Sequence, residues 1–180
     1  MGKNSQMRRS SHRHGFTLVE LMVVIGIIGI IALLVVPNFA SMQRRARTRS
    51  AAQKLAQHIK MIRERAIASS GNYLFSFPDA RHYRLQRPDG MTVDFRLGDT
   101  DAGQVRFGGA NVANQPPEAS MVAPGVNGID FPTGVLLIDA RGGATSGVAY
   151  ITDGIDNYAV GVNRVGKVAT YEYAGGTWNP

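Results

Sequence analysis

The 180-residue sequence contains no cysteine, which excludes a disulfide framework and a cysteine-based zinc site. Acidic residues are absent before Glu20. Polar side chains are absent from Leu21 to Val36, and neither glycine nor proline occurs from Asn38 to Ser69. Without disulfides or a cysteine-based zinc site, any folded domain must hold together by packing alone. The last two absences indicate an apolar segment followed by a long helix.

The apolar segment is long enough to cross a bilayer. At a rise of about 1.5 Å per residue, a helix from Phe16 to Val36 spans roughly 31 Å, the thickness of the hydrocarbon core. A buried core helix is the alternative, but one of this length usually has a polar face. The residues before the segment are basic, namely Lys3, Arg8, Arg9 and Arg13. This pattern predicts a single-pass helix with a cytoplasmic N-terminus.

A family resemblance lies at the junction between the basic and apolar segments. Gly15-Phe16-Thr17-Leu18-Val19-Glu20 resembles the processing site of type IV prepilins and of type II secretion pseudopilins. The resemblance implies that a prepilin peptidase cuts after Gly15 and methylates the new N-terminal Phe16. It also implies that Thr17, Glu20 and Pro37 belong to an assembly helix, in which Glu20 pairs with the Phe16 amine of a neighbouring subunit. The alternative is that Glu20 lies close enough to the membrane interface to be hydrated.

The net charge of +7 is unevenly distributed. Residues 1–15 contribute +4 and residues 38–70 contribute +7, whereas residues 71–180 contribute −3. Removal of residues 1–15 would leave a mature chain of +3. The basic character therefore belongs to the leader and the helix, and it is a poor reason to predict nucleic-acid binding.

The segment 38–70 has the composition of an amphipathic helix. Its apolar stripe follows a spacing of three and four residues through Ala52, Leu55, Ile59, Ile62 and Ala66. Pro37 is expected to kink the helix where the apolar run ends. Together with the apolar segment, this predicts one helix of about 53 residues that ends at Ser69–Ser70, with Gly71 as its C-cap.

From residue 71 the pattern changes to the period of β-strands, which predicts a β-rich domain at 71–180. The expected strands are 73–77, 82–87, 91–97, 105–107, 134–139, 147–152, 157–163 and 167–173, joined by short antiparallel turns. Residues at about 98–128 are rich in Gly, Ala, Asn and Pro and predict a long loop. That loop is expected to be a variable surface insertion or, alternatively, a contact surface for a neighbouring subunit.

A second, looser resemblance is to the GspH/FimT group of pseudopilins and minor pilins. It rests on three segments: Ala51 to Ile67, the step Ile129-Asp130-Phe131-Pro132-Thr133-Gly134, and Tyr158 to Val162 followed by Gly166-Lys167-Val168. The group often has Arg where this chain has Lys167. The resemblance implies two β-sheets packed on the helix, and a major pilin or major pseudopilin is the alternative.

Candidate ligand sites are weak. Asp153 and Asp156 cluster in a turn, as in calcium loops, but the spacing of an EF-hand is missing. A basic cluster, Arg44, Arg45, Arg47 and Arg49, is expected to be solvated or to face lipid headgroups. It could otherwise pair with acids of neighbouring subunits or contact DNA. The histidines lack metal-ligand spacing, and no catalytic constellation is evident, so the sequence predicts neither a cofactor nor an enzyme.

These observations predict an α+β, pilin-like protein: a leader at 1–15, a transmembrane and assembly segment at 16–37, an amphipathic continuation at 38–70 and the β-domain. The expected function is that of a minor pilin or pseudopilin, at the tip of a type II secretion pseudopilus or type IV pilus. The expected partners are the prepilin peptidase/methyltransferase, other pilins, an inner-membrane assembly platform and the bilayer. The expected location is the bacterial inner membrane, with a periplasmic C-terminal domain. A domain that binds DNA or a secreted substrate is the alternative.

Overall fold

The computed structural model describes residues 15–98, 105–120 and 127–180, with the backbone alone at 33–38. The predicted leader therefore lies almost wholly outside the described residues. The chain forms two compact units, Met1–Ser41 and Met42–Pro180. One helix, α1 (Leu18–Ser69, 52 residues), contributes to both units. Its length agrees with the helix predicted from the sequence.

The C-terminal end of α1 is closed by backbone hydrogen bonds. The Gly71 N–H donates to the Ala66 carbonyl at 3.1 Å, and the Ser70 N–H donates to the Ile67 carbonyl at 3.4 Å. Ser70 takes the left-handed conformation, with φ of 51°. This is the Schellman arrangement, with Ser70 in the position that was predicted for Gly71. Gly71 is needed for another reason, because a Cβ there would lie 2.5 Å from Pro88 Cγ.

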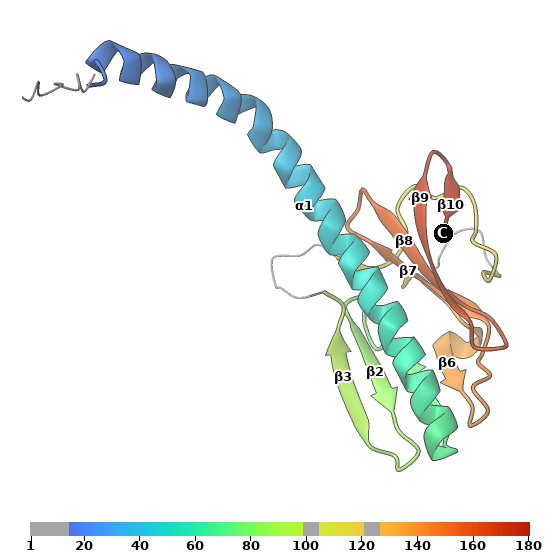
Figure 1. Ribbon diagram of the computed structural model, residues 1–180. Helices are drawn as coiled ribbons and strands as arrows, with labels where there is room; N and C mark the ends of the chain where they lie inside the picture. The colour runs from blue at the N-terminus through green and yellow to red at the C-terminus, as the bar shows by residue number, and fades with distance from the viewer. Residues whose placement is uncertain (1–14, 99–104, 121–126) are drawn as a thin grey trace, which may run out of the picture. The chain divides into compact units, whose positions relative to one another are not determined.

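Two antiparallel sheets make up the rest of the domain (Figure 1). The four-stranded sheet has the order β3-β2-β1-β6 and contains β1 (Tyr73–Ser76), β2 (His82–Gln86), β3 (Thr92–Arg96) and β6 (Val135–Ile138). The six-stranded sheet has the order β10-β9-β8-β7-β4, and β5 also pairs with β7. Its strands are β4 (Arg106–Phe107), β5 (Ile129–Asp130), β7 (Gly147–Thr152), β8 (Asn157–Val162), β9 (Val168–Ala174) and β10 (Thr177–Asn179). The α+β class and the two sheets are confirmed.

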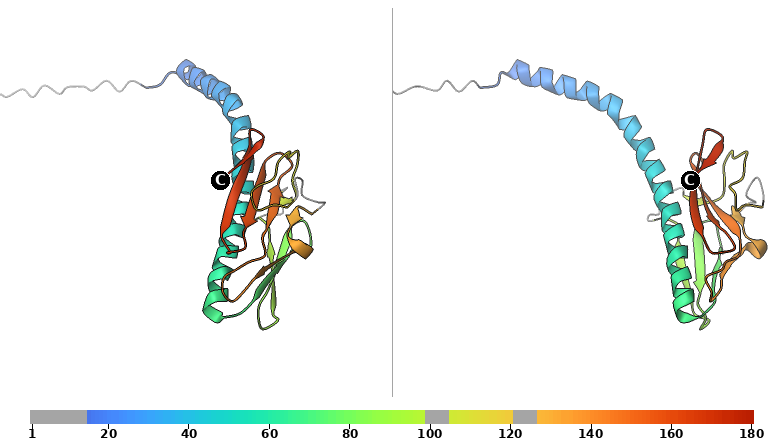
Figure 2. Two further views of the ribbon diagram at one scale, coloured as in Figure 1. Left: turned by 90° about the vertical axis from the view of Figure 1, so that its right-hand side faces the viewer. Right: turned by 45° about the vertical axis from the view of Figure 1, so that its right-hand side comes forward.

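The hydrophobic core lies between the second half of α1 and both sheets (Figure 2). All five residues of the predicted helix stripe are at most 1% exposed. They share one cluster with side chains of both sheets, among them Phe75 and Leu136 from the first and Ile151 and Val160 from the second. Full burial of one such aliphatic side chain stabilises a fold by about 1.5–3 kcal/mol. The stripe is therefore what fixes the helix to the domain.

Three short elements were not predicted: β5, β10 and the 3-10 turn η1 (Pro132–Gly134). Each has only two or three residues, too few for a period-two pattern to be recognised. Thr133 in η1 has a φ of 61°, a conformation that is uncommon for a β-branched residue. The predicted loop at 98–128 is only partly described, and its described part, 105–120, contains β4.

Candidate functional site: the processing and assembly segment

The bond between Gly15 and Phe16 lies in exposed, non-helical backbone just before α1 begins. The Phe16 side chain is 81% exposed. Nothing that the structure describes lies within 4 Å of a Cβ built on Gly15. The fold itself would therefore accept a larger residue at position 15. A requirement for glycine there would have to come from a molecule that binds this segment.

Thr17 and Glu20 form the N-terminal cap of α1. The Glu20 N–H donates to Thr17 Oγ1 at 3.2 Å, and the Leu21 N–H donates to the Thr17 carbonyl at 3.2 Å. Thr-Leu-Val-Glu has the sequence of a capping box, in which a Glu or Gln three residues after the cap supports the first turn. A carboxylate in the first turn also interacts favourably with the helix dipole. The Thr17 cap was not predicted from the sequence, although the T-x-x-E spacing was available.

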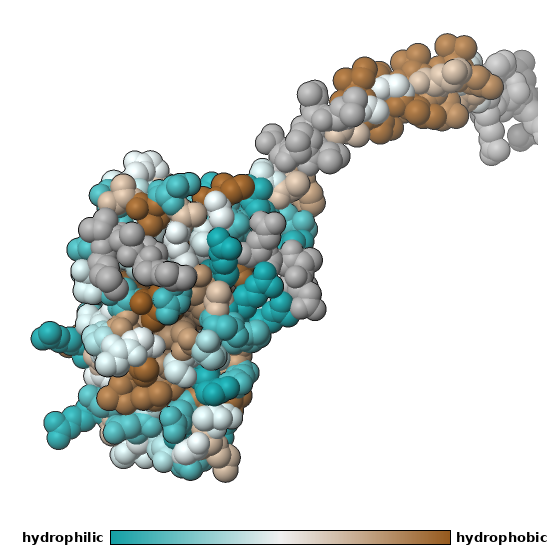
Figure 3. All heavy atoms as spheres, turned by 180° about the vertical axis from the view of Figure 1, so that it is seen from behind, coloured by the Kyte–Doolittle hydropathy of each residue, from teal (hydrophilic) through white to brown (hydrophobic). Residues whose placement is uncertain are grey.

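The first unit exposes apolar side chains on every side of the helix. The large ones that are more than half exposed include Leu18, Val19, Leu21, Met22, Val23, Ile25, Ile27, Ile28, Ile30 and Ile31. In Figure 3 much of the described surface of this unit is brown, the colour of hydrophobic residues. Exposed apolar surface of this extent marks a site that contacts lipid or protein. Among the described residues, no helix reaches the length and hydropathy of a membrane span.

Pro37 lies inside α1, as the helix continues through it. Its side chain lies outside the described residues, so the predicted kink remains a prediction.

In the second unit, α1 is tied to the turn between β7 and β8. Asp153, 6% exposed, has Oδ2 at 3.3 Å from Arg44 Nε and accepts a hydrogen bond from the Thr48 hydroxyl at 3.2 Å. Asp153 Oδ1 accepts from the N–H groups of Ile155 and Asp156, at 2.9 and 2.8 Å. Asp156 lies 4.0 Å from the same Arg44 nitrogen. These candidate metal ligands thus face a guanidinium, and the described residues contain no group of three potential ligands.

The basic cluster divides into two pairs. Arg45 binds Glu172 of β9, and the hydrogen bond to that carboxylate raises the pKa of Arg45. Arg44 and Arg45 therefore pair with acids of their own chain, in place of the alternative that they pair with acids of neighbouring subunits, and their side chains stay 41% and 56% exposed. The pairing arises because the β7–β8 turn and β9 lie against the helix, a long-range contact that local patterns do not report. Arg47 and Arg49 are exposed.

Arg63 joins the helix to two turns of the sheets. Its Nε donates to the Gly142 carbonyl at 2.8 Å, and a terminal nitrogen donates to the Val165 carbonyl at 3.2 Å. Position 166 beside this contact has room only for glycine, because a Cβ built there would lie 2.1 Å from the Gly142 carbonyl oxygen. Arg63 thus acts as a clamp for the ends of two hairpins.

After β4, residues 110–120 form a strap over the outer face of the six-stranded sheet. The Trp178 indole donates to the Asn114 carbonyl at 2.8 Å, and the Tyr171 hydroxyl donates to Glu118 at 3.0 Å. Burial, and the bond to Glu118, raise the pKa of Tyr171 to about 12. The strap covers a small second cluster that includes Val148 and Tyr150. The described part of the predicted loop is therefore a bonded cover of the sheet.

Comparisons with known proteins concern the N-terminal segment. A family model described as a prokaryotic N-terminal methylation motif matches residues 10–36. The type IV major pilin protein PilA of Myxococcus xanthus (strain DK1622) is 44% identical over 48 residues, which are 27% of this chain. The N-terminal segment of this chain is similar to that of type IV prepilins. The matched region spans only 22% of the length of that relative.

The prepilin-like segment begins before the exposed Gly15–Phe16 bond and ends within the apolar run. No solved structure matches the chain. The β-domain is consequently described here by its own geometry, and the GspH/FimT resemblance remains a prediction.

Proposed function

We propose that this protein is a pilin or pseudopilin subunit with no enzymatic activity, cleaved after Gly15 and methylated on Phe16 by a prepilin peptidase. The observation that best supports the proposal is the combination of the methylation motif with a helix that exposes apolar side chains on every side. Such a surface is stable in lipid or against other helices and not in water. We infer a subunit that is held in the inner membrane by the run Leu21 to Val36 and later packs by the same surface in a filament.

The finer assignment is to a minor subunit of the GspH/FimT group, at the tip of a type II secretion pseudopilus or type IV pilus. Its support is the arrangement of an amphipathic helix under two sheets, together with the three sequence segments that resemble the group. The pairing of Arg44 and Arg45 within the chain leaves less basic surface for DNA. A structural role is therefore favoured over DNA binding.

Cleavage is tested by the intact mass of the protein purified from bacterial membranes. The expected chain begins at Phe16 and carries one added methyl group. Gly15→Val should abolish cleavage without changing the domain, because nothing described surrounds Gly15. Gly26→Val is the matched control, as position 26 is equally open and should leave cleavage unchanged. A wild-type chain that retains residues 1–15 would refute the processing.

Assembly is tested at Glu20, where charge and capping can be separated. Glu20→Leu should be cleaved and inserted but absent from sheared filaments, because it lacks the carboxylate for the Phe16 amine of a neighbour. Glu20→Gln keeps a capping side chain but removes the charge. If the ion pair matters, Glu20→Gln fails in the same way as Glu20→Leu. Normal incorporation of Glu20→Gln would show that the residue serves only as a cap.

A further inference from the structure

We propose that a basic groove between α1 and the four-stranded sheet binds an acidic peptide segment of another protein. The groove has a volume of about 410 Å³ and lies entirely within the domain unit. This inference goes beyond processing and filament packing, since neither uses this surface.

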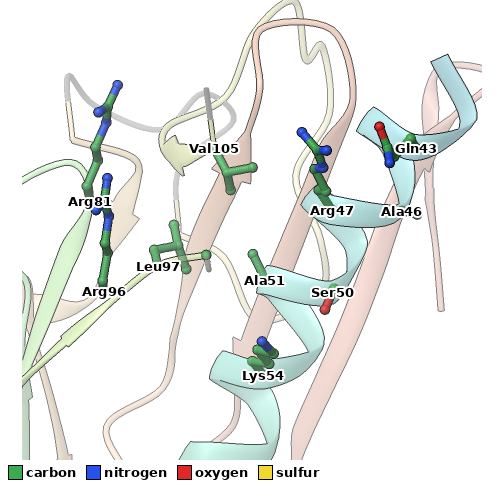
Figure 4. A pocket seen from close by; sticks show the side chains of 11 residues that line it. Gln43, Ala46, Arg47, Ser50, Ala51, Lys54, Arg81, Arg96, Leu97 and Val105 are labelled. Carbon is green, nitrogen blue, oxygen red and sulfur yellow. The ribbon is translucent and has the colours of Figure 1, made fainter. Parts of the chain in front are cut away.

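Four cationic side chains stand on two walls of the groove (Figure 4). Arg47 and Lys54 come from α1, seven residues and thus about 10 Å apart along the helix axis. Arg81 and Arg96 come from the opposite wall, where the Leu97 N–H donates to the Arg81 carbonyl at 2.7 Å and holds the two strand ends together. A bound segment would therefore meet positive charge on both sides.

The floor of the groove is apolar. Leu97 and Val105, which Figure 4 shows between the two walls, are 4% and 6% exposed. Glu and Asp side chains combine short apolar stems with a charged end, so they can contact the floor and reach the walls. A single phosphate would occupy only a small part of this volume.

Some arginines of the domain are paired with acids of the chain and others are not. Arg44, Arg45 and Arg84 each have a carboxylate partner. The described residues that line the groove, up to Gly98 and from Val105 onward, include no Asp or Glu. Lys54 and Arg96 make interactions of their own. Arg47 and Arg81 have no carboxylate partner within the described residues, so the proposal rests on these two cations.

The lining also favours a peptide over a nucleic acid. Single strands bind to grooves in which aromatic side chains stack with the bases. None of the groove's lining residues is aromatic. An acidic peptide needs only cations and apolar contact, and the groove provides both.

The test uses the full-length protein in neutral detergent and a fluorescein-labelled octaglutamate peptide, followed by fluorescence anisotropy at low salt. Octaglutamate should bind, and octaglutamine should not. Arg47→Gln combined with Arg81→Gln should weaken binding about tenfold, as expected for two partly screened charge contacts. Arg49→Gln with Arg141→Gln is the matched control, since it removes the same charge from exposed arginines outside the groove and should change the affinity less than about twofold.

Three outcomes would overturn the proposal. Octaglutamate binding could be absent, or the two double variants could weaken it equally, which would indicate general charge attraction. The third is groove-dependent binding of single-stranded DNA or of anionic phosphatidylglycerol vesicles without binding of octaglutamate. Far-ultraviolet circular dichroism of the variants confirms that each remains folded.

Discussion

The two halves of α1 have opposite surfaces although they belong to one helix. In the half that belongs to Met1–Ser41, large apolar side chains are exposed on all sides. In the half that begins at Met42, one stripe of apolar residues is almost completely buried, and the exposed large apolar side chains are Met42, Met61 and Ile67. A helix with one apolar stripe packs that stripe against one partner, here the sheets of its own chain. A helix that is apolar on all sides can be buried only in lipid or among helices of other chains.

The polar contacts show the same contrast. In the domain half, Arg44, Thr48 and Arg63 bond to turns far away in the sequence. In the first half, a local side-chain bond caps the helix, from the Glu20 N–H to the Thr17 hydroxyl. The domain half is therefore fixed at defined positions by contacts with distant parts of the chain.

The largest expected effect tests this contrast directly. Ile59→Ala should lower the free energy of unfolding of the domain by about 2–5 kcal/mol, because Ile59 is 1% exposed and its loss leaves a cavity. Ile27→Ala, at a residue that is 53% exposed, should change it by less than about 0.5 kcal/mol. Urea titration in detergent, followed by fluorescence of the single tryptophan, Trp178, measures both. Equal losses would disprove the division of the helix.

The next effect concerns the clamp at Arg63. Gly166→Ala should lower the free energy of unfolding by about 3 kcal/mol. A side chain strains the left-handed backbone at this position, and the new Cβ would clash with the Gly142 carbonyl. Gly176→Ala is the control, with a similar φ of +82° and no atom within 4 Å. It should cost only about 1 kcal/mol. The same urea titration separates conformational strain from the clash, and equal costs would show that the clamp is unimportant.

A smaller effect is expected at the ion pair between helix and hairpin. Arg44→Gln should lower stability by about 1 kcal/mol, because the buried Asp153 carboxylate loses a charged neighbour while Arg44 itself is partly solvated. Arg49→Gln, in an exposed residue of the same helix, should have almost no effect. High salt should reduce the difference between the two variants. If both behave alike in thermal unfolding, the pair contributes nothing measurable.

The smallest effect is a dependence on pH. His58 packs against Phe75, Tyr83 and Phe95, with the Phe95 ring centroid at 4.2 Å, and its Nδ1 lies 3.1 Å from the Tyr83 hydroxyl. Burial lowers the pKa of His58 below 6.5, and the charge of Arg65 lowers it further. The unfolded chain therefore takes up the proton first, so stability should be complete above about pH 6.5 and should fall as the pH drops toward the folded-state pKa.

His58→Phe should remove that part of the pH dependence while keeping the aromatic packing. His82→Gln is the control, because His82 is at a strand end and bonds to the exposed Asp79. Thermal midpoints between pH 5 and 8 provide the measurement. If the thermal midpoint of His58→Phe depends on pH as strongly as that of the unmodified protein, other groups cause the pH dependence.

Much of the fold could be predicted because its signals are local. The stripe from Ala52 to Ala66 and the longer strands have the periods of 3.6 and 2 that helices and half-buried strands require. The pairing of Arg44 with Asp153 could not be predicted, since it joins residues more than a hundred positions apart. The strap over Tyr150 was missed for the same reason. Its composition resembles a free loop, and only the position of Trp178 and Tyr171 in the folded sheet gives it partners.

The N-terminal methylation motif was predictable for a different reason. The motif is short and linear and contains Gly15, Phe16 and Glu20. A partner enzyme would recognise it as a stretch of consecutive residues, so it can be identified from the sequence without knowledge of the fold. What was not predicted from the sequence is the cap, in which the Thr17 hydroxyl accepts from the Glu20 N–H.

The strap has a consequence for the order in which the domain folds. Its bonds join Asn114 to Trp178 and Glu118 to Tyr171, so each closes a chain segment of more than fifty residues. Contacts that close long segments are entropically costly and form late. We therefore expect the β7–β8 hairpin, a local contact, to form first and the outer face around Tyr150 to stay open until the C-terminal hairpin has been made. During synthesis, that face is the part of the domain that remains uncovered for longest.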